Sequence, residues 1–367
     1  MRNLRKFVWF CICLVIIVID LIASFSAFIP PSSFSFISLF AIGFPYIYAA
    51  TILCCIISFF VNRRLAFLLL LVLISGVYNL KNTVAFNAPK DWHFKKNDST
   101  LRVMTWNVEG FVNSAPQSQP EAETRIKMLG TIHEFKPDVL CLQEYRNSDG
   151  VKWAASVRHE LDSLGYKYSF VSNDAVFQTK KEMHVYGVAI FSRYPFTDSG
   201  RVTISTEPRL EKLVYGDIAF NNKTIRLFTA HLVSFYLYAD TTGNDIYKIT
   251  YNRKRSIQSK IRETERQHEK EVKIIRKEIN KSPHPVIYCG DLNTTPASYN
   301  YRVLRGDLQD AFLQKGFGIG STFYKIAPTL RIDVCLADKA FSVLQSQVIE
   351  RKLSDHYPVI TDIAWKP

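Results

Sequence analysis

Several residue types are scarce in this chain of 367 residues, and each shortage excludes a class of protein. Seven cysteines are too few for a disulfide-stapled scaffold of this length. Fifteen glycines and fifteen prolines exclude a collagen-like or linker-like chain, and 47% apolar residues exclude a disordered one. The most informative shortage is local. Residues 1–80 contain one acidic residue, Asp20, whereas the rest of the chain carries mixed charge with a basic excess, so the two parts need different solvents.

Residues 1–80 contain three long apolar runs. The runs at 7–29 and 36–60 exceed the ~20 residues that a helix needs to cross a bilayer. The third run, at 65–80, is shorter, but Arg64 and Lys81 at its ends can reach the interface. We predict three transmembrane helices here rather than buried core helices, because consecutive apolar runs of this length, with Asp20 as their one charged residue, are rare in soluble proteins.

Basic residues flank these runs unevenly. They precede the first run and lie between the second and the third, whereas the loop at 30–35 is uncharged. The positive-inside rule therefore places the N-terminus and residues 61–64 in the cytoplasm. If the first run is instead a cleaved signal peptide, the remaining body still lies outside. We predict a multi-pass protein of the cell (inner) membrane, with a polar tether at 81–100 and a periplasmic body at 101–367.

In this body, short apolar runs alternate with polar segments, and several runs end in polar residues. The runs at 101–110, 137–146, 224–232 and 284–293 deliver Asn107, Glu144, His231, and Asp291 with Asn293, respectively. Asp333 begins a further run, and Asp355 and His356 precede the last one. Buried strands that deliver polar groups at their ends are how α/β enzymes build a site.

The side chains in this set favour one kind of chemistry. Carboxylates and amides without cysteine suit Mg²⁺ or Mn²⁺ rather than Zn²⁺. Such a cation neutralises phosphate oxygens and lowers the pKa of a bound water, and an Asp–His pair supports a charged imidazole. Each residue alone is more often a strand-end acid, a turn residue or a helix cap. Together, in this order, they predict metal-assisted hydrolysis of a phosphate ester.

The body, from about residue 101 to 365, resembles the endonuclease/exonuclease/phosphatase superfamily. The matching motifs are TWNV (105–108), LQE (142–144), GVAIFSRYP (187–195), TAHL (229–232), GDLN (290–293), RID (331–333) and SDHYP (354–358). The resemblance implies an α/β (α+β) four-layer sandwich of two mixed β-sheets with helices outside. The TAHL motif is similar to that of the deoxyribonuclease I and sphingomyelinase branches, and abasic-site endonucleases do not share it.

The resemblance also implies a role for each residue of the set. Glu144 corresponds to the main metal ligand, with Asn107 close to the metal or the phosphate and Asp355 supporting the metal or the water. Asp291 orients or deprotonates the attacking water, and Asn293 holds the phosphate. His356, oriented by Asp333, lies at the phosphate, and His231 donates to a phosphate oxygen or the leaving group. Because Asn293 also lies in a glycosylation sequon, and a glycan there would block the site, a bacterial envelope fits best.

Two variable segments follow His231. Residues 252–281 are strongly basic and have apolar residues at helical spacing, which predicts an amphipathic helix with a positive outer face. That face either attracts polyanions or is simply solvated. Residues 233–251 hold five aromatic residues that either stack on substrate or cover the core: Phe235, Tyr236, Tyr238, Tyr247 and Tyr251.

We therefore expect a membrane-anchored, Mg²⁺-dependent hydrolase that cleaves phosphodiesters, as a nuclease does, outside the cytoplasm. The first alternative is a phosphodiesterase or phosphatase that acts on phospholipid or sphingomyelin-type head groups. The second is an envelope protein that uses the fold only for binding. The expected partners are the substrate, nucleic acid or a lipid head group, and the bilayer; no protein partner is predicted.

Overall fold

The computed structural model describes residues 2–111, 121–149, 156–178, 183–205, 211–235 and 257–366. The chain folds into two compact units. Unit 1 comprises Met1–Val84, Phe235–Val272 and Thr294–Leu304. Unit 2 comprises Ala85–Ser234, Lys273–Asn293 and Arg305–Pro367.

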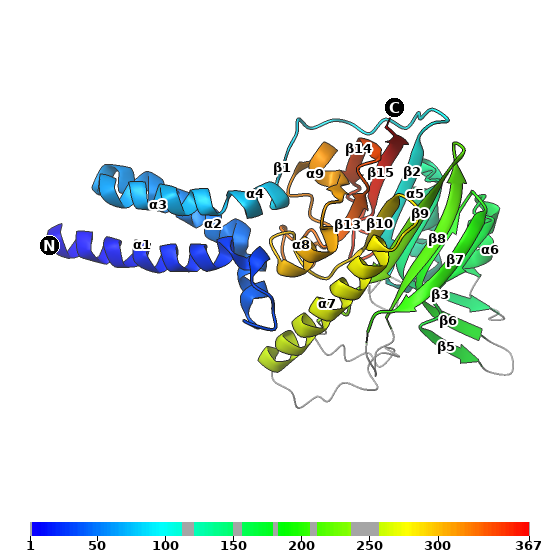
Figure 1. Ribbon diagram of the computed structural model, residues 1–367, viewed down its shortest axis with the longest axis horizontal. Coiled ribbons are helices and arrows are strands. Elements are labelled where there is room, and N and C mark those ends of the chain that lie inside the picture. Colours follow the sequence, from blue (N-terminus) through cyan, green and yellow to red (C-terminus); the bar gives the residue numbers. More distant parts are fainter. Residues whose placement is uncertain are drawn as a thin grey trace. The chain divides into compact units, whose positions relative to one another are not determined.

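Unit 2 is built on two mixed β-sheets (Figure 1). The six-stranded sheet has the order β11-β13-β10-β9-β8-β7. Its strands are β7 (Phe196–Thr203), β8 (Lys212–Phe220), β9 (Lys223–His231), β10 (Val286–Asp291), β11 (Gln309–Asp310) and β13 (Asp333–Ala337). The seven-stranded sheet has the order β14-β15-β2-β3-β6-β4, and β5 also pairs with β6. Its strands are β2 (Leu101–Asn107), β3 (Val139–Asp149), β4 (Tyr168–Val171), β5 (Ala175–Gln178), β6 (Met183–Ser192), β14 (Phe341–Val348) and β15 (Val359–Trp365).

The two sheets pack face to face because alternate residues of their strands are apolar. Residues such as Val103, Cys141, Leu227 and Cys289 form one buried cluster that draws on both sheets. The opposite face of β2 and β3 packs against helices α5 (Glu121–Phe135) and α6 (Val157–Ser163). The predicted sandwich of two mixed sheets with helices outside is confirmed.

Short elements complete unit 2. They are β1 (Ala85–Phe86), η2 (Glu109–Phe111), α9 (Ala311–Lys315) and β12 (Phe317–Gly318). β1 pairs with β12, and the side chain of Asn87 donates to two carbonyl groups at the end of α9. Arg102 stacks over Trp92, and Lys96 forms an ion pair with Asp138. Residues 85–100, which belong to the expected tether, are thus held along unit 2.

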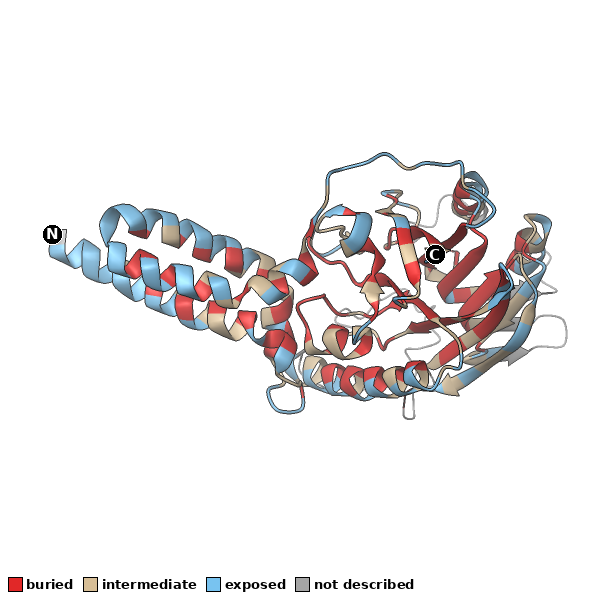
Figure 2. Ribbon diagram, turned by 45° about the horizontal axis from the view of Figure 1, so that its top comes forward, coloured by how far each residue is buried: buried red, intermediate tan, exposed pale blue. Residues whose placement is uncertain are grey.

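The N-terminal part of unit 1 is a bundle of apolar helices: α1 (Arg2–Ser24), α2 (Ile37–Val61), α3 (Arg63–Ser75) and α4 (Val77–Thr83), with the short η1 (Ser26–Phe28) after α1. Large apolar side chains such as Phe7, Leu14, Phe60 and Phe67 are exposed. Figure 2 shows exposed residues along the outside of these helices. Large exposed apolar surfaces mark sites of contact with a membrane or another protein. Two helices, Asn3–Phe28 and Ile37–Val61, are long and apolar enough to cross a membrane.

The third predicted span is a bent pair rather than one straight helix. α3 and α4 meet at Gly76 with a bend of 52°. A Cβ atom at Gly76 would lie 2.6 Å from the ring of Tyr48 and 2.8 Å from Oγ of Ser24, so only glycine admits this close approach. The Tyr48 hydroxyl donates to the Leu73 carbonyl, which lies in the last turn of α3.

Two further helices, α7 (Ile257–Asn280) and α8 (Tyr299–Arg305), begin in unit 1 and end in unit 2. α7 confirms the amphipathic helix predicted at 252–281, since Val272, Ile275 and Ile279 are buried. Residues 236–256, which include four of the five aromatic residues noted after His231, lie outside the described residues.

Candidate active site

The candidate site lies at one edge of the sandwich, where the inward-facing rows of side chains turn from apolar to polar. Along β10 the inward positions are Ile287, Cys289 and then Asp291. The same alternation brings Asn107 to the end of β2 and His231 to the end of β9. The period of two therefore places these three side chains on the inner faces of the two sheets.

Pairing of the strands brings the ends of these rows together. Asp291 is directly opposite His231 on the parallel strand β9 and opposite Asp333 on the antiparallel strand β13. Asn107 comes from the other sheet, and its Nδ2 donates to Oδ2 of Asp291 at 3.1 Å. Just behind them, Gln143 bridges the sheets by donating to Thr229 Oγ1 at 2.9 Å. The site thus contains residues of both sheets.

Asp291 is the centre of the site and is fully buried. Its Oδ1 accepts from the backbone N–H of Asn293 at 2.8 Å. Its Oδ2 lies 3.6 Å from Nε2 of both His231 and His356. Burial, and then the charge of Asp333, raises the pKa of Asp291 to about 6, while His356 and His231 act in the opposite direction.

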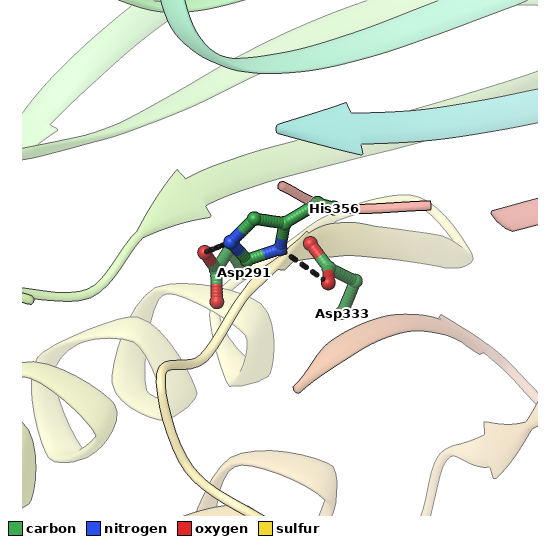
Figure 3. Close-up of side chains that lie close together, drawn as sticks. All are labelled: Asp291, Asp333 and His356. Atoms are coloured by element: carbon green, nitrogen blue, oxygen red, sulfur yellow. Dashed lines mark hydrogen bonds and ion pairs between the residues drawn. The ribbon is translucent and has the colours of Figure 1, made fainter. Parts of the chain in front are cut away.

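His356 is held between two carboxylates, as Figure 3 shows. Its Nδ1 lies 2.8 Å from Oδ2 of Asp333, and its Nε2 faces Asp291. Burial alone would lower the pKa of His356, but the charges of Asp333 and Asp291 outweigh it and raise that pKa well above 6.5. Trp106 donates to the His356 carbonyl, and the ring of Phe323 packs 4.9 Å away, so the imidazole has a fixed orientation.

Asp291, Asp333 and His356 also offer three ligand atoms within 4.8 Å of one another, so this group itself is a potential cation site. Each imidazole nitrogen of His356 already faces a carboxylate, and a cation bound by either nitrogen would displace one of these contacts. The geometry therefore fits a buried acid–histidine pair better than a metal centre.

Glu144 provides the exposed carboxylate of the site. A β-bulge between Leu142 and Tyr145 interrupts the pairing of β3 with β6, and Glu144 adopts a positive φ of 51° there. Its side chain is 40% exposed, its Oε1 lies 3.1 Å from Nδ2 of Asn107, and the same oxygen lies 3.7 Å from Nε2 of His231. The bulge thus turns the carboxylate toward the site while leaving it open to solvent.

The residues around Glu144 fit a hydrated divalent cation. Mg²⁺ commonly binds one or two carboxylates and keeps several waters, so one exposed carboxylate is sufficient. The Asn107 oxygen accepts from the Glu109 N–H, and its nitrogen donates to Glu144 and Asp291. In this arrangement Asn107 orients the two carboxylates, and its oxygen keeps a second lone pair that would be available to a cation.

Asn293 and His231 form a second pair. The Asn293 side-chain nitrogen donates to the Leu232 carbonyl at 2.8 Å and lies 3.0 Å from Nε2 of His231. Asn293 has a φ of 47°, in the left-handed region that residues other than glycine rarely adopt. Oγ of Ser234 lies 3.4 Å from the same imidazole nitrogen.

Asp355 lies at the edge of this set. Its Oδ1 accepts from Ser354, and its Oδ2 lies 3.9 Å from Nζ of Lys325. Ser354 in turn donates to the Asn107 carbonyl at 2.8 Å, so the loop before β15 is bonded to the end of β2. The structure therefore brings seven of the eight predicted residues together directly, and it connects Asp355 to them through Ser354.

Sequence reasoning missed several supporting residues. Ser354 was visible within the SDHYP motif, but nothing in the sequence indicates that its hydroxyl binds Asn107. Thr322 accepts from the N–H groups of Ile332 and Asp333, and Lys325 approaches Asp355 and Glu109. These two residues lie outside every recognised motif, so only the folded chain reveals them.

Comparison with known proteins decides the family. Residues 104–356 match the model of the Endonuclease/Exonuclease/phosphatase family. The chain belongs to this family. Members are hydrolases that act on phosphoester bonds, generally with a divalent metal. The resemblance to this superfamily seen in the sequence motifs is confirmed. Residues 5–83 match a domain of unknown function, and no curated protein matches the chain.

Solved structures of family members share the fold. An endonuclease/exonuclease/phosphatase from Beutenbergia cavernae DSM 12333 has 21% identity and a TM-score of 0.52, covering 73% of this chain and 72% of that one. The human Nocturnin catalytic domain, solved with a bound sulfate anion, has 17% identity and a TM-score of 0.52, with 73% and 94% covered. D. rerio TDP2, complexed with a single-strand DNA product, has 19% identity and a TM-score of 0.51, with 72% and 99% covered.

Proposed function

We propose that this family member is a membrane-anchored phosphoesterase that uses a divalent cation, Mg²⁺ or Mn²⁺, to hydrolyse phosphodiesters outside the cytoplasm. The observation that carries the proposal is the position of Asp291. It is a buried carboxylate in contact with two imidazoles and two asparagines, with the exposed carboxylate of Glu144 alongside. A protein that used the fold only for binding would have no need for this arrangement.

In this proposal each residue acts on one part of the reaction. A cation held at Glu144 supplies charge neutralisation at the phosphate and a lower pKa for water. Asp291 accepts the proton of the attacking water. Protonated His356, kept charged by Asp333, donates from Nε2 to a phosphate oxygen, and Asn293 hydrogen-bonds another. His231 donates to a phosphate oxygen or to the leaving oxygen as the P–O ester bond breaks.

The substrate is proposed to be a phosphodiester of the nucleic-acid type. The D. rerio TDP2 structure, which holds a single-strand DNA product, supports this choice at the level of the fold. The second candidate is a phospholipid head group, and the apolar helices of unit 1 favour it because they would keep the enzyme at a bilayer.

The test is a substrate panel with the full-length protein in detergent micelles. It comprises bis-p-nitrophenyl phosphate, p-nitrophenyl phosphate, plasmid DNA and labelled phospholipid vesicles, each with Mg²⁺, Mn²⁺ or EDTA. We expect turnover that EDTA removes and that Glu144→Gln reduces about a thousandfold. The exposed Glu350→Gln serves as the matched control with unchanged turnover. Turnover in EDTA, or full activity of Glu144→Gln, would contradict the proposal.

The proposed orientation has its own support. Contacts within unit 1 join the loop between α1 and α2 to residues of α7 and α8, so these segments share one side of the membrane if α1 and α2 span it. The positive-inside rule assigns that side to the outside. A periplasm-dependent reporter fused after Pro367 should be active, and activity of a cytoplasm-dependent reporter at the same position would reverse the orientation.

A further inference from the structure

Unit 1 contains more than the apolar helices. The chain leaves unit 2 directly after Asn293, and residues Thr294–Leu304 belong to unit 1. One of the proposed phosphate-binding residues is therefore covalently continuous with a segment that folds together with the membrane helices.

Specific hydrogen bonds hold this segment to η1, just after α1. Nε of Arg302 donates to the Ala27 carbonyl at 2.6 Å, and Oγ of Ser26 lies 2.7 Å from the carbonyl oxygens of both Ala297 and Ala23, which share its one proton. The Arg302 guanidinium also lies 5.2 Å from the centre of the Phe28 ring. Ala297 is 1% exposed and packs in a cluster with residues of α1 and α2, including Phe44.

The first half of α7 adds two more connections. Glu265, which is fully buried, accepts from Nδ2 of Asn300 at 3.1 Å, and Ser38 at the start of α2 acts against the rise in the pKa of Glu265 that burial causes. Glu269 accepts from both the backbone N–H and the hydroxyl of Ser32, at 2.8 Å and 3.1 Å. A membrane anchor that only tethers an enzyme requires none of these buried, directional contacts.

The backbone of Asn293 adopts a left-handed φ of 47°, which asparagine tolerates better than most residues with a side chain. Contacts on both sides of the residue favour this conformation. On one side it is held by the hydrogen bond from its N–H to Asp291. On the other side the chain continues through the buried Thr294 and Thr295 to Ala297, which is the residue that Ser26 holds.

We infer that Arg302 and Ser26 are positioning residues for catalysis. They hold residues 294–302 on the membrane helices and thereby fix the backbone of Asn293, whose side chain faces His231. The inference rests on the proposed phosphoesterase function and adds to it a role for the membrane region. That role acts through the peptide chain that runs from Asn293 into residues 294–302.

The experiment measures kcat and KM of the full-length protein in detergent micelles with bis-p-nitrophenyl phosphate, a water-soluble substrate that needs no bilayer. We expect Arg302→Ala to lower kcat about tenfold or more while KM changes less than about threefold, because a small displacement of a positioned group affects the transition state most. Arg302→Lys, which keeps a donor and a cation near Phe28, should restore part of kcat. Arg266→Ala, at an exposed position of α7, is the matched control.

A double-mutant cycle separates positioning from loss of stability. If Arg302 acts through Asn293, adding Arg302→Ala to Asn293→Ala should lower kcat by less than about twofold further. Hydrogen exchange of peptides covering 288–304 should become faster in Arg302→Ala and stay unchanged in Arg266→Ala. Faster exchange with an unchanged kcat, or full additivity of the two substitutions, would overturn the inference. Absence of turnover in the unmodified protein would instead remove the proposed function itself, and this inference with it.

Discussion

Asp291 in unit 2 and Glu265 in unit 1 are both completely buried carboxylates, and burial is the largest cause of a raised pKa in each, to about 6 and about 7 respectively. Their neighbours differ. Asp291 contacts two histidines and lies opposite another carboxylate, whereas Glu265 accepts a hydrogen bond from Asn300 and has the hydroxyl of Ser38 nearby.

The difference shows what burial alone does and does not provide. Removing a carboxylate from water raises its pKa wherever it happens. Titratable partners near Asp291 allow a proton to move between groups during a reaction, whereas the hydroxyl of Ser38 and the amide of Asn300 near Glu265 do not titrate in this range. We therefore propose that Asp291 takes part in the reaction, whereas Glu265 contributes to the packing of α7 against its neighbours.

The substitution Asp291→Asn has the largest expected effect, and it tests whether this buried carboxylate takes part in the reaction. We expect kcat for bis-p-nitrophenyl phosphate to fall by about 10³-fold, because the amide cannot accept a proton from water. The melting temperature should not fall, since the substitution removes a desolvated acid. Asp98→Asn, at an exposed position, provides the control for the same chemical change. If the variant kept a tenth of the activity, Asp291 would not be the proton acceptor.

The next effect concerns the orientation and charge of His356. Asp333→Asn should lower kcat by about 10²-fold and change its pH dependence. Because Asp333 helps to raise the pKa of His356, the asparagine variant should lose the protonated imidazole at lower pH. The alkaline limb of the pH–rate profile should therefore move to lower pH. A profile that kept its position while kcat fell would show that Asp333 acts only through geometry.

The effect expected for Glu265 concerns stability rather than turnover. Its folded pKa of about 7 lies above the ordinary 4.5, so the folded state favours the protonated acid. The stabilisation that Glu265 gives to the folded state is therefore fully present below pH 4.5 and is lost as the pH rises through about 7. The free energy of unfolding falls by about 3 kcal/mol over this range. The melting temperature of the solubilised protein should therefore fall over this pH range, and Glu265→Gln should remove this part of its dependence on pH. Identical pH profiles of the melting temperature for the two proteins would contradict the assignment.

Much of the site was predictable from the sequence because strand periodicity is local. Asn107, His231 and Asp291 end apolar runs, and the period of two already implies which face their side chains occupy. The apolar character of α1 and α2 and the amphipathic pattern of α7 were equally visible, since each depends only on neighbours within one element.

Other features depend on residues far apart in the chain. The exposure of Glu144 results from a bulge at which β3 loses register with β6, and the motif LQE contains no sign of it. The bend between α3 and α4 depends on the ring of Tyr48. Glu265 looks from its sequence like one more charged residue of a solvated helix, yet it is buried through contacts with Ser38 and Asn300, which lie 227 and 35 residues away.

Residue order alone specifies which residues are apolar, how they alternate and which polar groups follow each strand. These properties predict two sheets, a set of apolar helices and the candidate catalytic side chains. The folded chain was needed to show that Asn107 faces Asp291 from the opposite sheet, and that the segment after Asn293 folds with the apolar helices of unit 1. The reason is physical: periodicity is set by neighbouring residues, whereas pairing depends on which distant surfaces exclude water together.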